Sequence, residues 1–221
     1  MPEQRSASQI LFGHLPEQTV DVRGGVWRVR RWLRPHIEAH VDDETLRREL
    51  RRLAAEWGQN GRDGGFIQDL FRAAPIRVLS LDRDRGVELE PYPRIWICSN
   101  SNCRRIHPAP NAACPCGSQG RKGQLHFVGY CEGCGNIREP WIPRCPTHQQ
   151  CRITFPGTAS GAEIVFSCPI CSAELRRGFG FPRCNCGTQI SFNVHRSSSV
   201  YSPRSVVIVN PPSHETMRRL Q

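Results

Sequence analysis

The twelve cysteines of this sequence all lie between residues 98 and 186, and they occur in six close pairs. Two cysteines separated by one to four residues can direct both sulfurs onto one ion, and two such pairs complete a tetrahedral metal site. Six pairs therefore predict three sites with no cysteine left over. The pairs are Cys98/Cys103, Cys114/Cys116, Cys131/Cys134, Cys145/Cys151, Cys168/Cys171 and Cys184/Cys186.

A disulfide framework, an iron–sulfur cluster and a catalytic zinc site each fit the cysteine pattern less well. Disulfide frameworks belong to oxidising compartments, whereas the N-terminus has no apolar export segment with a cleavage site. An iron–sulfur protein is disfavoured because the ferredoxin run of closely spaced cysteines is absent. A zinc deaminase needs H-x-E followed by P-C-x-x-C; His36 and Glu38 supply H-x-E, but they lie far from Cys168, which no proline precedes. We therefore expect about three structural Zn²⁺ ions per chain.

Loop length suggests which cysteines share an ion. Joining neighbouring pairs closes the shortest loops and so costs the least chain entropy. An interleaved grouping remains open, because each doubling of loop length adds only about 0.6 kcal/mol. The predicted ligand sets are Cys98, Cys103, Cys114 and Cys116 for the first ion, Cys131, Cys134, Cys145 and Cys151 for the second, with His148 as a substitute ligand, and Cys168, Cys171, Cys184 and Cys186 for the third.

The composition explains why metal would be needed. Only 38% of the 221 residues are hydrophobic and the mean hydropathy is −0.49, which is lean for a single large core. Structural zinc contributes about 10–16 kcal/mol per site in small fingers, enough to replace part of a core. No apolar run approaches the roughly 18 residues of a membrane span, so we expect no membrane association and a cytoplasmic location.

The formal charge of +10 is unevenly distributed. Residues 1–90 hold 15 basic and 15 acidic side chains, whereas residues 91–221 hold 15 and 5. Three zinc–thiolate sites would subtract about 6 charges and leave about +4 on the second half. This mild basic surface is a weak nucleic-acid signal. The candidate contacts are Arg104, Arg105, Arg121, Lys122, Arg176, Arg177 and Arg183.

Apolar periodicity predicts the elements of the first half. Alternation over residues 19–29, around Gly24 and Gly25, predicts a β-hairpin with valines on one face. Leucines recurring at helical spacing predict a helix over residues 43–57, with arginines on its solvated side. Residues 66–74 suggest a short helix after a Gly-rich loop over residues 59–65. Residues 76–81 and 87–89 suggest a second hairpin.

In the second half, short β-type runs lead into and out of the cysteine turns, as in zinc ribbons. A last strand is expected over residues 206–209. The predicted fold class is α+β: a small N-terminal α/β-hairpin domain over residues 1–90, followed by a β-rich array of zinc-ribbon-like knuckles over residues 91–212, and a loose tail over residues 213–221.

Three segments resemble DrmB proteins of the DISARM anti-phage system. The runs over residues 92–98, 129–141 and 199–209 are similar to that family's aromatic-Pro-Arg-Trp segment before a cysteine, its C-x-x-G-H segment ending in Pro-Trp, and its Val-Tyr-x-Pro segment. The resemblance covers roughly residues 91–212. It differs at Cys134-Gly135, where the family has Gly-His, and the family runs on for hundreds of residues. The resemblance implies a shortened or split relative that serves a DNA helicase or translocase.

The sequence shows no catalytic constellation. A phosphate-binding G-x4-G-K-[S/T] loop is absent, and the second half offers only five acidic side chains. We therefore expect no enzymatic activity and predict a zinc-scaffolded accessory subunit of a helicase complex. The alternatives are a stand-alone nucleic-acid-binding zinc ribbon and a purely structural adaptor between proteins. Exposed aromatics mark protein interfaces, and Phe179 and Phe181 are predicted as the exposed pair among Trp96, Trp141, Phe179 and Phe181.

Overall fold

A computed structural model describes residues 2–3, 10, 13–38, 41–54, 76–80, 86–157, 161–201 and 206. Some of the elements expected from the sequence lie outside these residues. They are the loop over 59–65, the short helix over 66–74, the end of the long helix at Trp57, the last strand beyond Val206, and the tail over 213–221. Among the described residues, no helix has the length and apolar character needed to cross a membrane.

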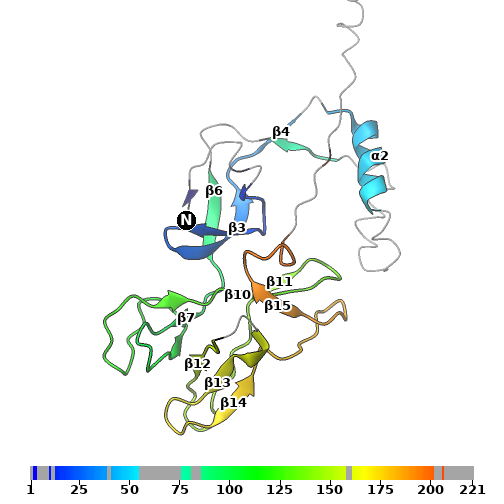
Figure 1. Ribbon diagram of the computed structural model, residues 1–221. Helices are drawn as coiled ribbons and strands as arrows, with labels where there is room; N and C mark the ends of the chain where they lie inside the picture. Colours follow the sequence, from blue (N-terminus) through cyan, green and yellow to red (C-terminus); the bar gives the residue numbers. More distant parts are fainter. Residues whose placement is uncertain are drawn as a thin grey trace, which may run out of the picture.

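The first half is built on one antiparallel sheet (Figure 1). The predicted hairpin is confirmed, but its turn is formed by Arg23 and Gly24, which both have positive φ, 52° and 70°, as a two-residue hairpin turn requires. Val22, Val29 and Leu89 form the centre of its core. The strand order is β1 (Pro2–Glu3), β6 (Val87–Pro91), β3 (Gly25–Trp32) and β2 (Thr19–Val22).

The predicted second hairpin is wrong. β5 (Leu79–Ser80) pairs with β4 (His36–Ile37), whereas β6 pairs with β3. The reason is burial: Val87 and Leu89 are at most 1% exposed because they complete the apolar face of β3, whereas Leu79 is 45% exposed. A long-range partner that buries two side chains outweighs the shorter loop of a local hairpin.

The predicted helix is present as α2 (Asp43–Ala54) and lies to one side of the sheet (Figure 1). Asp42 caps it, because its carboxylate accepts a 3.0 Å hydrogen bond from the Thr45 N–H. Hydrogen bonds from the Thr45 side chain and from its backbone N–H lower the pKa of Asp42. Arg47 departs from the solvated face that the sequence suggests. Its side chain is buried, with Nε 2.8 Å from Asp43 one turn earlier.

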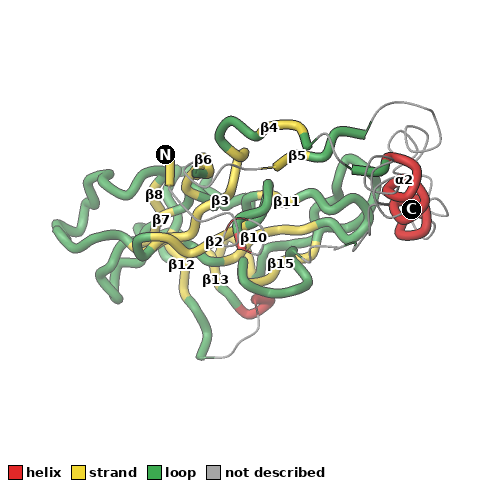
Figure 2. The backbone as a smooth tube through the Cα atoms, turned by 90° about the horizontal axis from the view of Figure 1, so that it is seen from above, coloured by secondary structure: helices red, strands yellow, loops and turns green. Residues whose placement is uncertain are grey.

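The second half consists of three small antiparallel sheets, and the β-rich α+β class is confirmed (Figure 2). A 3₁₀ turn (Gly161–Glu163) precedes strand β13. The sheets are β8 (Ile106–His107), β7 (Trp96–Ile97) and β9 (Gly123–Gln124); β11 (Ile137–Arg138), β10 (Phe127–Tyr130) and β15 (Ser191–Val194); and β12 (Arg152–Thr154), β13 (Val165–Ser167) and β14 (Glu174–Arg177).

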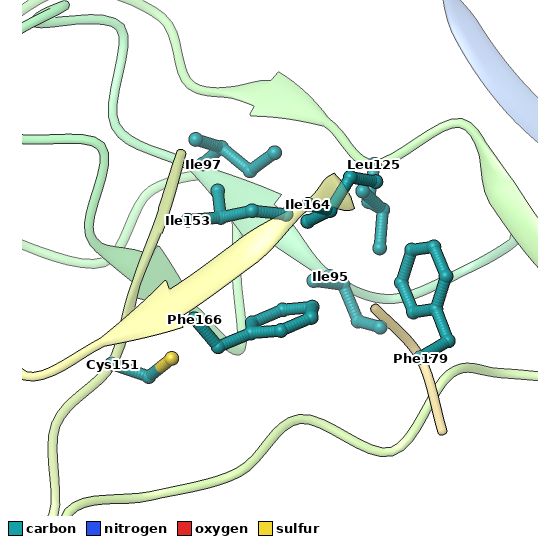
Figure 3. Close-up of a cluster of buried hydrophobic side chains, with 8 residues drawn as sticks. All are labelled: Ile95, Ile97, Leu125, Cys151, Ile153, Ile164, Phe166 and Phe179. Atoms are coloured by element: carbon teal, nitrogen blue, oxygen red, sulfur yellow. The ribbon is translucent and has the colours of Figure 1, made fainter. Parts of the chain in front are cut away.

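The largest apolar cluster of the described second half receives side chains from all three sheets (Figure 3), and smaller clusters lie around Tyr130 and around Ile190. Ile97 comes from β7, Phe166 from β13, and Phe127 and Phe192 pack against the cluster from β10 and β15. Strands of two to four residues cannot bury a core by themselves. All three sheets contribute side chains to this cluster, so the cluster stays packed only while each sheet is folded.

Polar contacts join the two halves at the predicted domain boundary. The Gln124 side chain accepts a 2.8 Å hydrogen bond from the Val26 N–H and donates to the carbonyls of Val26 and Pro93 at 2.9 and 2.8 Å. The Thr19 hydroxyl donates to the His195 carbonyl at 3.0 Å. The sheet of the first half is therefore hydrogen-bonded to residues of the second half. The division into two domains at residue 90 stays a prediction.

Candidate metal centre

Eleven of the cysteines and one histidine gather in three clusters of four. Within each cluster the four ligand atoms lie within 4.8 Å of one another. All twelve cysteines are free of disulfide bonds. The first cluster holds Cys98, Cys103, Cys114 and Cys116, the second holds Cys131, Cys134, Cys184 and Cys186, and the third holds Cys145, His148, Cys168 and Cys171.

The distances suit a tetrahedral ion. Metal–sulfur bonds of about 2.3 Å place two sulfurs of a tetrahedron about 3.8 Å apart, whereas a disulfide joins them at about 2.05 Å. The observed Sγ–Sγ distances are 3.4–3.6 Å in the first cluster and 3.3 and 3.6 Å in the second. In the third, Nδ1 of His148 lies 3.5 Å from Cys145 and 3.4 Å from Cys168. Each cluster can hold one metal ion.

A repeated turn presents half of the ligands. Three pairs have the spacing C-x-x-[C/H], and in each the first cysteine donates its N–H to the carbonyl five residues later. The residue four positions later donates back to the carbonyl of the cysteine, and its positive φ closes the turn directly after the second ligand. The returning donors are Gly135 at 2.8 Å with φ 69°, Gln149 at 2.8 Å with φ 53°, and Ser172 at 3.0 Å with φ 59°.

Two further pairs use a tighter turn with the sequence Cys-x-Cys-Gly. The N–H of Gly117 donates to the Cys114 carbonyl at 3.0 Å, and that of Gly187 to the Cys184 carbonyl at 2.8 Å. Both glycines have positive φ, 74° and 87°, a conformation in which a side chain is strained. The sequence therefore closes each tight turn with the one residue that adopts it freely.

The first predicted ligand set agrees with the structure, but the second and third are wrong. Cys131 and Cys134 meet Cys184 and Cys186, and the third cluster is nested between these two pairs. The sheets follow the same arrangement, since β10 pairs with both β11 and β15 while β12, β13 and β14 lie between them in the sequence. Short loops did not decide the grouping. The small entropic advantage of neighbouring pairs was outweighed by the strand pairing of β10 with β15.

Cys151 is the one cysteine outside the clusters, and its prediction as a ligand is wrong. It follows the Cys145–His148 turn and stands immediately before β12, where its side chain lies in the apolar cluster beside Phe166 (Figure 3). Burial raises the pKa of this thiol to about 12, so it stays protonated at neutral pH. His148, which the sequence offered only as a substitute, occupies the position equivalent to Cys134 and Cys171.

The thiols of one cluster have divergent pKa values, because four sulfurs so close cannot all be negative without a cation. The backbone N–H of Ser118 lowers the pKa of Cys116 to about 7. The Thr188 hydroxyl lowers that of Cys186 to about 6, while burial raises those of Cys103 and Cys134 to about 12. A divalent cation removes this conflict by letting every thiol ionise.

The predicted basic contacts do not form one surface. Arg176 is half-buried, with its guanidinium 4.9 Å from the Trp141 ring and 5.2 Å from that of Phe166. Arg177 pairs with Glu174 at 3.0 Å, and Lys122 donates to the Pro110 carbonyl at 3.5 Å. Arg183 is exposed near the second cluster, whereas Arg104, Arg105 and Arg121 lie around the first.

The predicted pair of exposed aromatics is half wrong. Phe181 is 82% exposed, but Phe179 is only 5% exposed, because its ring packs between those of Phe127 and Phe192 at 5.2 and 4.9 Å. Trp96 is also buried, whereas Trp141 is 68% exposed. The most accessible aromatic side chains of the four are therefore Trp141 and Phe181.

Fold and clusters together define a β-rich protein in which each of three short sheets carries, in its turns, a four-ligand set able to hold a metal ion. A family model described as "Domain of unknown function (DUF8724)" matches residues 6–202, so the chain belongs to this family. The match spans both halves of the molecule. No curated protein matches the sequence.

Proposed function

We propose that this protein is a zinc-scaffolded, non-catalytic accessory subunit of a DNA helicase or translocase complex, acting in the cytoplasm in phage defence. The observation that carries the scaffold part is the completeness of the three clusters. Each offers four soft ligands at tetrahedral spacing, the arrangement of structural zinc, whereas catalytic zinc keeps a position for water. The helicase and defence parts rest on the resemblance of residues 91–212 to DrmB proteins.

Zinc is the ion that the donor sets favour. Sets of four cysteines, or of three cysteines and one histidine, are typical of structural zinc, and a thiolate-rich set selects against Mg²⁺ and Ca²⁺. Elemental analysis of the purified protein is expected to give close to three zinc ions per chain and no iron. One equivalent or less would refute the three-site arrangement.

An exposed strip formed by Trp141, Arg176 and Phe181 is the surface proposed for the protein partner. Trp141 and Phe181 are both largely exposed, and Arg176 joins them, since it stacks on Trp141 and lies against Gly180. Tryptophan, phenylalanine and arginine are the side chains enriched at protein interfaces. Arg176 is held by Gly178 and Trp141 carbonyls, so the strip is preformed.

The test is co-expression with each helicase or translocase encoded beside the gene. One of them is expected to co-elute with the protein in gel filtration and to require its zinc. A Trp141→Ala/Phe181→Ala double variant is expected to lose co-elution while keeping three zinc ions. Phe155→Ala, which removes an exposed aromatic elsewhere, is the matched control and is expected to bind normally. Absence of any co-eluting helicase would overturn the proposed function.

A further inference from the structure

A cleft of about 490 Å³ lies beside the first metal cluster, within the roughly 300–1,000 Å³ range of ligand pockets. It is formed by three separate segments: the end of β7 with the turn that follows it, the residues from Arg121 through β9 to Phe127, and Phe155 after β12. Its floor contains the buried Ile97 and Leu125, and its rim carries Arg104, Arg121, His126 and Phe155.

We propose that this cleft binds a single-stranded nucleic acid, with an unpaired base stacked against Phe155 and the plane of Arg104, and with the two flanking phosphates held by Arg121 and by the edge of Arg104. This proposal supplies a ligand for the accessory subunit described above, but it concerns the isolated protein and needs no helicase. None of the residues that line the cleft is acidic. The cleft thus combines an apolar floor with positive charge at its rim, which matches a base joined to a phosphate.

The two arginines are available for a ligand. Neither Arg104 nor Arg121 makes an ion pair within the part of the chain that the structure describes, and both are exposed. Other arginines of the second half are engaged: Arg94 pairs with Glu139 and Arg177 with Glu174. An exposed guanidinium without a carboxylate partner is suited to bidentate contact with phosphate oxygens.

Arg104 and Phe155 provide the stacking surface. The Arg104 guanidinium lies 5.7 Å from the centre of the Phe155 ring, and Phe155 is 36% exposed although it is a large apolar side chain. Bases stack both on aromatic rings and on the plane of an arginine. Arg104 also has a left-handed backbone, φ 46°, which places its side chain at the end of the turn that carries Cys103. Zinc in the first cluster would therefore hold this arginine in place.

The cleft favours a single strand over a duplex. In a duplex the bases are stacked on each other, so only the phosphates could reach the rim and the apolar floor would stay unfilled. Cys98 also borders the cleft, and with zinc its cluster would carry about −2. Phosphates are therefore expected over Arg121 and Arg104, away from the sulfurs, in a small number of contacts.

Fluorescence anisotropy of the zinc-loaded full chain tests this proposal, with labelled oligo-dT and oligo-U of about 16 nucleotides as probes. Two phosphate contacts predict a slope of about −1.4 in a plot of log affinity against log salt, or a roughly sevenfold loss between about 50 and 200 mM. The two probes distinguish DNA from RNA as the ligand. A duplex of the same length is expected to bind more weakly than either.

Three variants locate the binding. Phe155→Ala is expected to weaken binding roughly 5- to 150-fold, the value of one base–aromatic stack, with little change in salt slope. Arg121→Ala is expected to reduce the slope by about 0.7, and Arg104→Ala to impair both affinity and slope. The matched controls are Phe181→Ala, an exposed aromatic outside the cleft, and Arg144→Ala, an exposed arginine outside it. Zinc content is measured for every variant.

The outcomes separate this inference from the proposed function. Lack of binding to both single-stranded probes, equal binding of the duplex, or equal losses in Arg144→Ala and Arg121→Ala would each overturn the cleft as the site. Failure of a helicase to co-elute would overturn the proposed function and leave these measurements unchanged.

Discussion

The two halves of the molecule are both small β structures, but different interactions stabilise them. In the first half, an eight-residue strand, β3, pairs on both sides and buries Val26 and Val29 completely. Glu90 on β6 also pairs across the sheet with Arg28 and Arg30. In the second half no strand exceeds four residues within the described chain, and each sheet begins or ends at a metal-ligand turn.

The comparison indicates that metal sites in the second half would take the place of the long paired strands of the first half. A sheet with long strands brings distant residues together through its own hydrogen bonds and apolar face. The short sheets of the second half divide their buried side chains among several small clusters, and the second metal cluster joins residues more than fifty positions apart in the sequence. Removal of metal is therefore expected to act on the second half first, and perturbations of decreasing severity can test this contrast.

Chelation of the metal is expected to be the most severe perturbation, because structural zinc contributes about 10–16 kcal/mol per site in small zinc domains. After treatment with a chelator, amides of β10 and β13 should lose protection in hydrogen-exchange mass spectrometry, while those of β3 and β6 retain part of theirs. Limited proteolysis should cut first between Cys98 and Cys186. Equal loss in β3 and β6 would show that the halves unfold as one unit.

Pairs of ligand substitutions should reveal the nesting of the clusters. Cys131→Ala with Cys184→Ala removes two ligands of one cluster, so the protein should still bind about two of its three zinc ions. Cys131→Ala with Cys145→Ala damages two clusters, and about one ion should remain. A sequential grouping of ligands predicts the reverse result. Zinc analysis by mass spectrometry under native conditions distinguishes the two arrangements directly.

Local signals in the sequence predicted a good part of this structure. The hairpin of β2 and β3, the start of α2 and the first ligand set all depend on residues close in sequence. The turn signal in the third cluster was also present, because Cys145-x-x-His148 has the same spacing as Cys131-x-x-Cys134 and Cys168-x-x-Cys171. Counting cysteines alone hid this equivalence and assigned Cys151 to a site.

The incorrect predictions share one physical cause. The partners of β6, the pairing of the second and third clusters and the burial of Phe179 are all decided by contacts between segments distant in sequence. Gly-Phe-Gly-Phe over residues 178–181 looks uniform, yet one ring fills the core between β10 and β15 while the other is exposed. Only the sheet pairing distinguishes them, and no local pattern carries that information.

Gln124→Ala tests how strongly the two halves depend on each other. The substitution leaves the buried Val26 N–H without its partner, which is expected to cost about 1–3 kcal/mol. Because Gln124 bonds to both Val26 and Pro93, protection should fall in β3 as well as in β9. Gln149→Ala is the matched control, since that side chain bonds only within its own turn. Chemical denaturation of both variants at full zinc occupancy provides the measurement.

Cys151→Ala is expected to have the mildest consequence, although Cys151 is among the more buried cysteines. The substitution removes one atom from the shared core, a change comparable to deleting a buried methyl group, and should cost about 1 kcal/mol with all three zinc ions retained.

Cys171→Ala is the informative comparison, because Cys171 is exposed but belongs to the third cluster. Its loss should release one ion and destabilise the protein far more. Zinc analysis and the midpoint of denaturation would measure both effects. Loss of an ion from Cys151→Ala would mean that this thiol, and not His148, completes the third site, and the contrast between core and ligand cysteines would then be incorrect.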